Sequence, residues 1–182
     1  MPPKKRITKE LILQKAFEII HEEGIESLNA RYLAKQLNCS TMPIFQSFQD
    51  MNELKAEVKT RIDEYYTAFI NRYIDKEDYL FTISFAYINF ARKERNFFGA
   101  LFVNPLLGSR TVQEVIDSPW NRETIQCTAV QFGISIQDSE AVYRDIRFYA
   151  HGIATQIYGG NMTLSEEEIQ TLLRNAMEKF LN

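Results

Sequence analysis

Hydrophobic residues recur every three or four positions along most of the chain, which is the spacing of one face of an α-helix. The first such stretch starts after Thr8, a good N-cap, and ends at Gly24, a good C-cap. No segment gives a convincing strand pattern. The sequence therefore predicts an all-α protein, whose first helix buries Ile12, Ala16, Phe17 and Ile20.

Two shorter helices are predicted between residues 29 and 48. Asn29 is the expected N-cap of the first helix and Ser40 that of the second. Pro43 falls in the first turn of the second helix, where a backbone N–H would have no helical partner. Asn38 lies in the tight turn between them and tolerates left-handed backbone. Two helices joined by so short a turn form the helix-turn-helix signature.

The residues after this motif predict a bundle of longer helices. Asp50 and Glu53 form a capping-box-like pair that opens a helix running to about residue 74. Residues 80–90 are apolar nearly all round, which is typical of a helix in the middle of a bundle. Further helical segments are predicted at 96–107, 111–117, 121–132, 138–158 and from Ser165 onward.

The composition agrees with a folded helical protein. The 182 residues, 45% apolar and 25% charged, suffice for one or two domains, and only 7 Gly and 5 Pro leave few turns. We find no secretory signal and no apolar run of about 18 residues, so we expect a soluble cytoplasmic protein without a membrane span. Cys39 and Cys127 lie far apart, which argues against a disulfide scaffold and predicts two small buried hydrophobes.

The sequence carries no enzymatic motif. Its two histidines, His21 and His151, have no Cys or carboxylate neighbours at metal-ligand spacing, and no P-loop, GxGxxG or GxSxG occurs. We therefore expect neither an enzyme nor a bound metal or cofactor. Residues 1–55 carry eight basic and seven acidic side chains, and residues 56–182 carry 13 and 17. This balance argues against indiscriminate coating of nucleic acid but allows one local binding face.

The segment that begins at Gly24, GIESLNARYLAKQLNCSTMPIFQSFQDMNEL, resembles the DNA-binding region of the tetracycline-repressor (TetR) family of bacterial regulators. Gly24 matches the glycine after the family's first helix, and Leu54 closes the pattern. A later segment, RFYAHGIATQIYGG, resembles the penultimate helix of many members. The other matches are Leu28-Asn29 for a Thr/Ser pair, Leu33-Ala34 for Ile-Ala, Asn38-Cys39-Ser40 for Gly-Val-Ser, and Ile44-Phe45-Gln46-Ser47-Phe48 for Leu-Tyr-x-His-Phe.

The resemblance implies a helix-turn-helix DNA-binding domain over residues 1–50 and a helical ligand-binding and dimerisation domain over residues 51–182. It further implies a ligand-responsive repressor that binds a palindromic operator as a homodimer. The effector would be a small apolar or aromatic molecule held in the second domain.

Three departures from the family pattern motivate an alternative interpretation. Phe45 replaces Tyr, Ser47 replaces His and Met51 replaces Lys, so donors to the DNA backbone are lost or shortened. Lys55, one turn after Met51, could partly compensate. The alternative is a helical ligand-binding or protein-interaction dimer with weak or lost DNA binding.

The docking geometry of helix-turn-helix proteins singles out candidate DNA contacts. Thr41, Met42 and Gln46 are expected at base edges, with Gln46 suited to adenine. Phe45, at the family's Tyr position, is a candidate contact as well, although Phe45 and Phe48 are expected to pack mainly in the core. Phosphate contacts are expected from Asn29, Ala30, Arg31, Ser40, Ser47 and Lys55, and from an N-terminal arm of Lys4, Lys5 and Arg6. For Arg31 and for the arm, the alternative is a charged side chain that is merely exposed to solvent.

The second domain is dense in aromatic residues. These residues either form its core or line a pocket for a flat or apolar effector between the helices. For His151 the alternative is a satisfied core or interface histidine. The pocket candidates are Phe85, Asn89, Phe102, Trp120, Gln126, Arg147 and His151.

The last two predicted helices carry apolar stripes that suit a four-helix bundle between two subunits, as in the family. The alternative is that both stripes pack only on their own subunit. The candidate interface residues are Val142, Ile146, Ala150, Ile153, Ile157, Ile169, Leu172, Leu173, Ala176 and Phe180.

Overall fold

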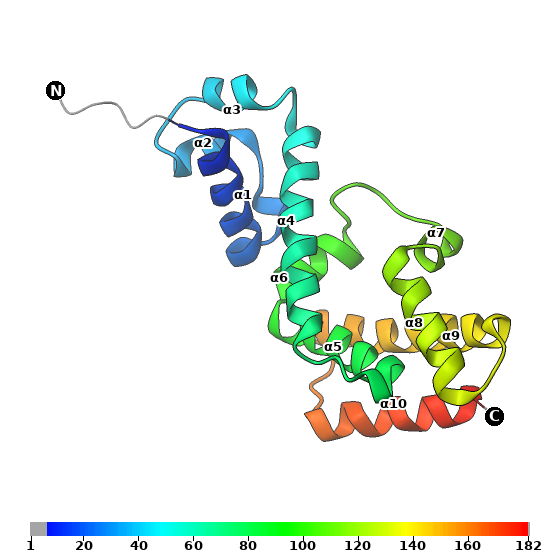
Figure 1. Ribbon diagram of the computed structural model, residues 1–182. Helices are drawn as coiled ribbons and strands as arrows, with labels where there is room; N and C mark the ends of the chain where they lie inside the picture. The colour runs from blue at the N-terminus through cyan, green and yellow to red at the C-terminus, as the bar shows by residue number, and fades with distance from the viewer. Residues whose placement is uncertain (1–6, 182) are drawn as a thin grey trace. The chain divides into compact units, whose positions relative to one another are not determined.

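The computed structural model describes residues 7–181, and this range contains helices and turns but no strand (Figure 1). The all-α prediction is confirmed. The chain forms two compact units, residues 1–65 with 96–108 and residues 66–95 with 109–182. The helices are α1 (Lys9–Glu23), α2 (Ala30–Gln36), α3 (Met42–Ser47), α4 (Met51–Asn71), α5 (Tyr79–Lys93), α6 (Arg95–Phe98), α7 (Val112–Ile116), α8 (Pro119–Phe132), α9 (Ile136–Tyr158) and α10 (Glu166–Leu181), with 3₁₀ turns η1 (Ile25–Ser27) and η2 (Lys76–Asp78) and a π-helical turn η3 (Gly99–Val103).

Helix α1 has the ends that its sequence predicts. The Thr8 hydroxyl accepts a hydrogen bond from the Leu11 N–H at 3.2 Å, so it caps an otherwise unpaired donor. At the other end Gly24, with φ of 88°, donates its N–H to the Ile20 carbonyl at 3.0 Å. A positive φ favours glycine, so the chain can leave the helix here without backbone strain.

Helices α2 and α3 form the predicted helix-turn-helix. The Asn29 side chain accepts the Tyr32 N–H at 2.9 Å and caps α2, and Asn38 holds the left-handed turn with φ of 52°. The N-cap of α3 is Thr41 rather than the predicted Ser40. The reason is that the Thr41 carbonyl accepts the Ile44 and Phe45 N–H groups, which starts the helix one residue later.

One hydrophobic core holds the first three helices and the first part of α4 together. Its fully buried side chains come from all four helices, and burial of each Ile, Leu or Val among them contributes about 1.5–3 kcal/mol. They include Ile12, Ala16, Ile20, Leu33, Ile44, Leu54 and Val58, each 0% exposed.

Residues 96–108 belong to the first unit, although they follow α5 in sequence. The Asn96 amide donates to the His21 carbonyl at 2.8 Å in the last turn of α1, where helical carbonyls lack partners. The Phe97 ring is fully buried and lies 4.7 Å from both the Phe17 and the His21 rings. The predicted helix over 96–107 is thus a short α-helix followed by a π-helical turn.

In the second unit α5 is packed by α8, α9 and α10. Its residues from Ala86 to Ala91 are all buried, as its apolar sequence predicts. Arg92 near the end of α5 pairs with Glu166 at the start of α10, and Asp78, just before α5, pairs with Arg174. The two helices therefore run antiparallel.

Ser165 with Glu168 forms the predicted capping box of α10. Helix α8 begins at Pro119, two residues before the predicted Asn121, because proline suits the first turn of a helix. Helix α9 begins two residues before the expected Asp138, because the Ser135 hydroxyl accepts the Asp138 N–H at 3.0 Å. Cys39, in the turn between α2 and α3, and Cys127, on α8, are half-buried rather than buried as predicted. Within residues 7–181, no helix is both long and apolar enough to cross a membrane.

Candidate nucleic-acid interface and effector site

Helix α3 presents one face to solvent. Two of its inward positions, Ile44 and Phe48, are 0% and 2% exposed and anchor the helix in the core. Met42 and Phe45 are 65% and 48% exposed, and Gln46 is exposed beside them. Because six helical residues make fewer than two turns, anchoring one side leaves the other side free to meet a partner.

Phe45 corrects the expectation that it packs in the core. The inward positions four residues apart are taken by Ile44 and Phe48, so a side chain next to Ile44 on the helix points away from α1. Phe45 lies three residues after the exposed Met42, so the two side chains share the outward face of α3. Thr41, at the start of α3, is half-buried.

The Ser47 hydroxyl already donates a hydrogen bond within its own helix. Its Oγ donates to the Pro43 carbonyl at 3.0 Å, one turn earlier in α3. A phosphate contact from Ser47 would require this local bond to break, because a phosphodiester has no proton to donate to the hydroxyl oxygen. Ser47 is therefore a weaker phosphate donor than its position predicts.

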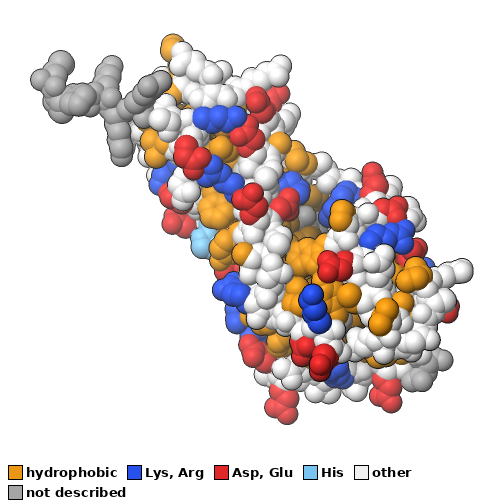
Figure 2. Space-filling model, viewed as in Figure 1, with side chains coloured by type: hydrophobic (Ala, Val, Ile, Leu, Met, Phe, Trp, Pro, Cys, Tyr) orange, Lys and Arg blue, Asp and Glu red, His pale blue; other side chains and the backbone are white. Residues whose placement is uncertain are grey.

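The predicted phosphate-contacting residues are only partly free. Arg31, Asn29 and Ser40 are exposed, whereas Ala30 and Lys55 are half-buried. The Asn29 amide oxygen already caps α2. The predicted arm of Lys4, Lys5 and Arg6 lies outside the described residues. On the face shown in Figure 2 acidic and basic side chains are interspersed.

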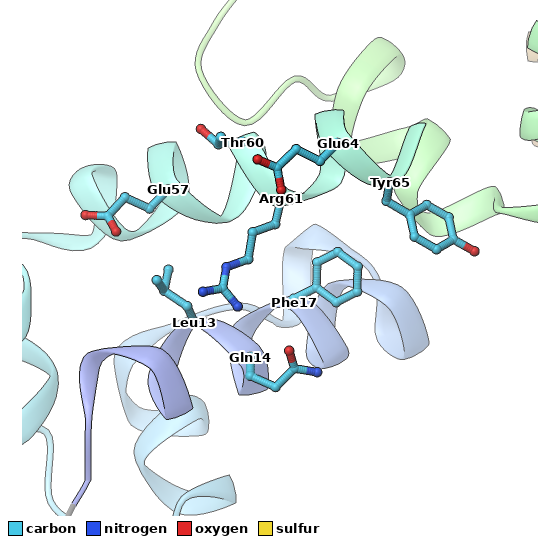
Figure 3. A pocket seen from close by; sticks show the side chains of 8 residues that line it. All are labelled: Leu13, Gln14, Phe17, Glu57, Thr60, Arg61, Glu64 and Tyr65. Carbon is cyan, nitrogen blue, oxygen red and sulfur yellow. The ribbon is translucent and has the colours of Figure 1, made fainter. Parts of the chain in front are cut away.

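A groove of about 710 Å³ lies between α1 and α4 in the first unit (Figure 3). Arg61 reaches from α4 toward α1 and pairs with Glu10, and Lys9 pairs with Glu57 at 2.5 Å. These pairs join α1 to α4, although exposed ion pairs stabilise little. None of the residues predicted for the effector pocket lines this groove. Its lining is Leu13, Gln14, Phe17, Glu57, Thr60, Arg61, Glu64 and Tyr65.

In the second unit, three predicted pocket residues lie in a tyrosine-rich cluster. The Tyr87 hydroxyl lies 2.8 Å from His151 Nδ1, and the Arg147 guanidinium carbon lies 5.6 Å from the centre of the Tyr87 ring. Trp120 donates its Nε1–H to the Tyr79 hydroxyl at 3.3 Å, and its ring lies 5.9 Å from that of Tyr66. Tyr66 also interacts electrostatically with Arg147.

Burial sets the protonation of this cluster. Burial raises the pKa of the Tyr87 and Tyr143 hydroxyls, so both remain protonated donors at neutral pH. Burial, with the nearby charge of Arg147, lowers the pKa of His151. The imidazole is therefore largely neutral at pH 7, while the guanidinium stays charged.

Spacing along α9 could have identified this cluster from the sequence. Tyr143, Arg147 and His151 are four residues apart, so they share one face of the helix. Arg147 and His151 are predicted pocket residues, whereas for the tyrosines the sequence leaves open whether they form the core or line the pocket.

The other predicted pocket residues do not join the cluster. Gln126 is exposed on α8, and Phe102 belongs to the first unit, where its ring lies 5.3 Å from Phe98. Phe85 packs against Phe81 and Tyr73. Asn89 is fully buried; its amide donates to the Phe85 carbonyl at 3.1 Å, and its Oδ1 has no hydrogen-bond partner among the described residues.

The predicted dimer residues divide into two groups. The first group is buried within its own subunit by the contacts of α9 and α10 with α5 and α8, so these side chains present little surface to a partner. The second group, Ile153, Ile157, Leu172 and Phe180, keeps exposed area. Phe148, which was not among the predicted residues, is 58% exposed on α9. The buried group is Val142, Ile146, Ala150, Ile169, Leu173 and Ala176.

The chain resembles solved structures of transcriptional regulators over nearly its whole length. A TetR-like regulator from Rhodococcus sp. RHA1 has a TM-score of 0.67 at 15% identity, covering 97% of each chain. A single-substitution variant of TetR from Acinetobacter baumannii AYE, in complex with minocycline, has a TM-score of 0.59 at 14% identity, covering 97% of this chain and 95% of that one. A further regulator from Rhodococcus sp. Rha1 has a TM-score of 0.58 at 16% identity, covering 96% of each.

No protein-family model and no curated protein matches the sequence. The structural likeness nevertheless covers both units, so the chain has the TetR-like fold, with an N-terminal helix-turn-helix and a C-terminal helical part. Among the described residues no group of three or more His, Cys, Asp or Glu side chains could hold a metal ion.

Proposed function

We propose that the protein is a DNA-binding transcriptional regulator, a repressor that acts as a homodimer on a palindromic operator and responds to a small effector. The observation that carries the proposal is the exposed face of α3, the second helix of a helix-turn-helix in a TetR-like fold. In such motifs this helix enters the major groove.

The side chains on α3 suit base contacts more than phosphate contacts. Gln46 can pair with the N6 and N7 edge of adenine, and Met42 and Phe45 can contact thymine methyl groups. Arg31 and Lys55 then supply the backbone contacts that Phe45 and Ser47 do not make. An A·T-rich half-site follows from this chemistry.

The homodimer places two copies of α3 about 34–36 Å apart, one turn of the duplex. The exposed apolar residues of α9 and α10 support it, with Phe148 and Phe180, 58% and 41% exposed, as its main contacts. Because α4 contributes residues to both units, it is the element through which an effector in the second unit changes the spacing of the α3 helices. A coupling of about 1–3 kcal/mol between the two sites is typical.

Selection of bound fragments from the source genome, followed by fluorescence anisotropy, tests the proposal. Binding should be specific, should weaken with rising salt, and should fall about 5- to 100-fold in Gln46→Ala. Gln131→Ala, which removes an exposed glutamine from α8, is the matched control and should bind as the wild type does. Failure to retain any fragment at low salt favours the alternative, a ligand-binding or protein-interaction dimer.

A further inference from the structure

Within residues 7–181 Arg147 has no carboxylate partner, whereas four other arginines of the second unit form ion pairs. Arg147 is mostly buried on α9. Its neighbours are the Tyr143, Tyr87 and Tyr66 side chains. The arginines with carboxylate partners are Arg92 with Glu166, Arg122 with Asp117 and Glu140, Arg144 with Asp145, and Arg174 with Asp78.

A buried cation without an anion is unfavourable, because its loss of hydration is not offset by a paired charge. The face of the Tyr87 ring, 5.6 Å away, compensates only part of that loss. A guanidinium also carries five N–H donors in a fixed fork that matches a carboxylate. A single bound anion would therefore offset the lost hydration of Arg147 and stabilise the site.

The described groups around Arg147 are neutral side chains that can donate hydrogen bonds, and none of them is a carboxylate. Tyr87 and Tyr143 stay protonated, and His151 is neutral and already linked to Tyr87. Arg110 adds a second positive charge that acts on Tyr143 from an exposed position. Tyr66 interacts electrostatically with Arg147, and its ring centre lies 5.9 Å from that of Trp120, so this aromatic pair suits an apolar body.

We propose that the effector is an organic monocarboxylic acid with an aromatic or apolar body, whose carboxylate pairs with Arg147 between α5 and α9. The Arg147 guanidinium neutralises one negative charge, whereas the second charge of a phosphate dianion would have only the exposed, solvent-screened Arg110 to offset it. Tyr143 supplies a further donor to the carboxylate, and the body lies against Tyr66 and Trp120. That the acid acts as an effector rests on the proposed function, whereas binding of the acid at Arg147 does not depend on DNA binding.

Matched acid and amide probes test the proposal on the full chain at pH 7.5. The pairs are benzoate and benzamide, 2-naphthoate and 2-naphthamide, indole-3-acetate and its amide, and decanoate and decanamide. Binding is followed by calorimetry and by the fluorescence of Trp120, the single tryptophan. At least one acid should bind about tenfold or more tightly than its amide.

Variants locate the binding. Arg147→Met should abolish the preference for the acid, and Arg147→Lys should retain part of it because the charge remains. Arg144→Met removes a positive charge from an exposed position of the same helix and should leave the preference intact. Thermal unfolding of each variant shows that it is folded, and removal of an unpaired buried charge should not lower the stability of Arg147→Met.

Two outcomes overturn the inference: no acid of the panel preferred over its amide, or equal preference in Arg147→Met and the wild type. DNA binding is measured separately with a selected operator. Operator binding without any acid preference contradicts this inference alone. An acid preference that depends on Arg147, without operator binding or release, contradicts the proposed function and leaves the anion site standing.

Discussion

The Tyr87 hydroxyl and His151 Nδ1 lie 2.8 Å apart and tie α5 to α9 by a hydrogen bond between partly buried side chains. Arg147 lies one turn before His151 on α9 and contacts the same Tyr87 ring. Protonation of His151 would place a second positive charge beside this guanidinium in a poorly hydrated region. The histidine therefore links the stability of the second unit to pH.

Stability should fall as the pH drops below about 6.5, the ordinary pKa of histidine. The folded-state pKa of His151 is lowered, first by burial and then by Arg147, so the unfolded chain binds the proton more readily. The loss begins near the unfolded pKa and is complete below the folded pKa. Urea denaturation between pH 5 and 8 measures it, and His151→Gln should flatten the slope in this window. An identical slope in the variant would contradict the assignment.

The turn of the helix-turn-helix should tolerate glycine but not alanine at position 38. Asn38 has φ of 52°, where a β-carbon without a polar side chain is strained. Asn38→Ala should therefore lower the free energy of unfolding by about 1 kcal/mol. Asn38→Gly should stay within about 0.5 kcal/mol, because relief of strain offsets the greater entropy of the unfolded chain. Equal effects of the two substitutions in urea denaturation would argue against this backbone explanation.

The Asn29 cap should contribute about 1 kcal/mol to the stability of the first unit. Its Oδ1 accepts the Tyr32 N–H at 2.9 Å, and Asn29→Ala leaves that donor without its partner. Asn52→Ala, an exposed asparagine in the first turn of α4, is the control and should change stability by less than about 0.5 kcal/mol. Denaturant midpoints of the two variants give the comparison. A similar midpoint for both would show that the cap adds little.

Phe148→Glu should convert the proposed homodimer into monomers. The phenyl ring is 58% exposed on α9, so a carboxylate there stays hydrated in the monomer but would be buried against a partner. Light scattering coupled to size exclusion should show the mass halved, with the helical circular dichroism unchanged. Val130→Glu, at an 84% exposed position of α8, is the control and should remain dimeric. A monomeric wild type would remove the basis for a two-fold operator.

The helices were predictable where local chemistry decides them. Thr8, Asn29 and the Ser165–Glu168 pair set helix ends through contacts within four residues, and such contacts can be recognised from sequence. Phe45 was placed wrongly because its exposure depends on which side of a six-residue helix meets α1. That choice is made by packing over a distance, and a short helix gives too few positions for its periodicity to show it.

The proposed effector site and the proposed dimer surface are harder to predict from sequence for the same reason. A stripe such as Val142 and Ile146 is apolar whether it meets α5 of its own subunit or a second copy, so periodicity does not distinguish the two. Arg147 is a predicted pocket residue from the sequence. Its isolation from carboxylates is a property of the neighbouring helices, which the sequence of α9 alone does not contain.

The return of residues 96–108 to the first unit means that the helix-turn-helix half is encoded in two separate stretches of the gene. During synthesis the ring of Phe97 reaches its place beside Phe17 only after the whole of α5 has been made. A fragment that stops after α4 would leave the surface of Phe17 that packs against Phe97 exposed to water. The nascent chain completes this packing only once Phe97 has been synthesised. Folding of the helix-turn-helix unit therefore depends on residues that are synthesised only after α5 of the second unit.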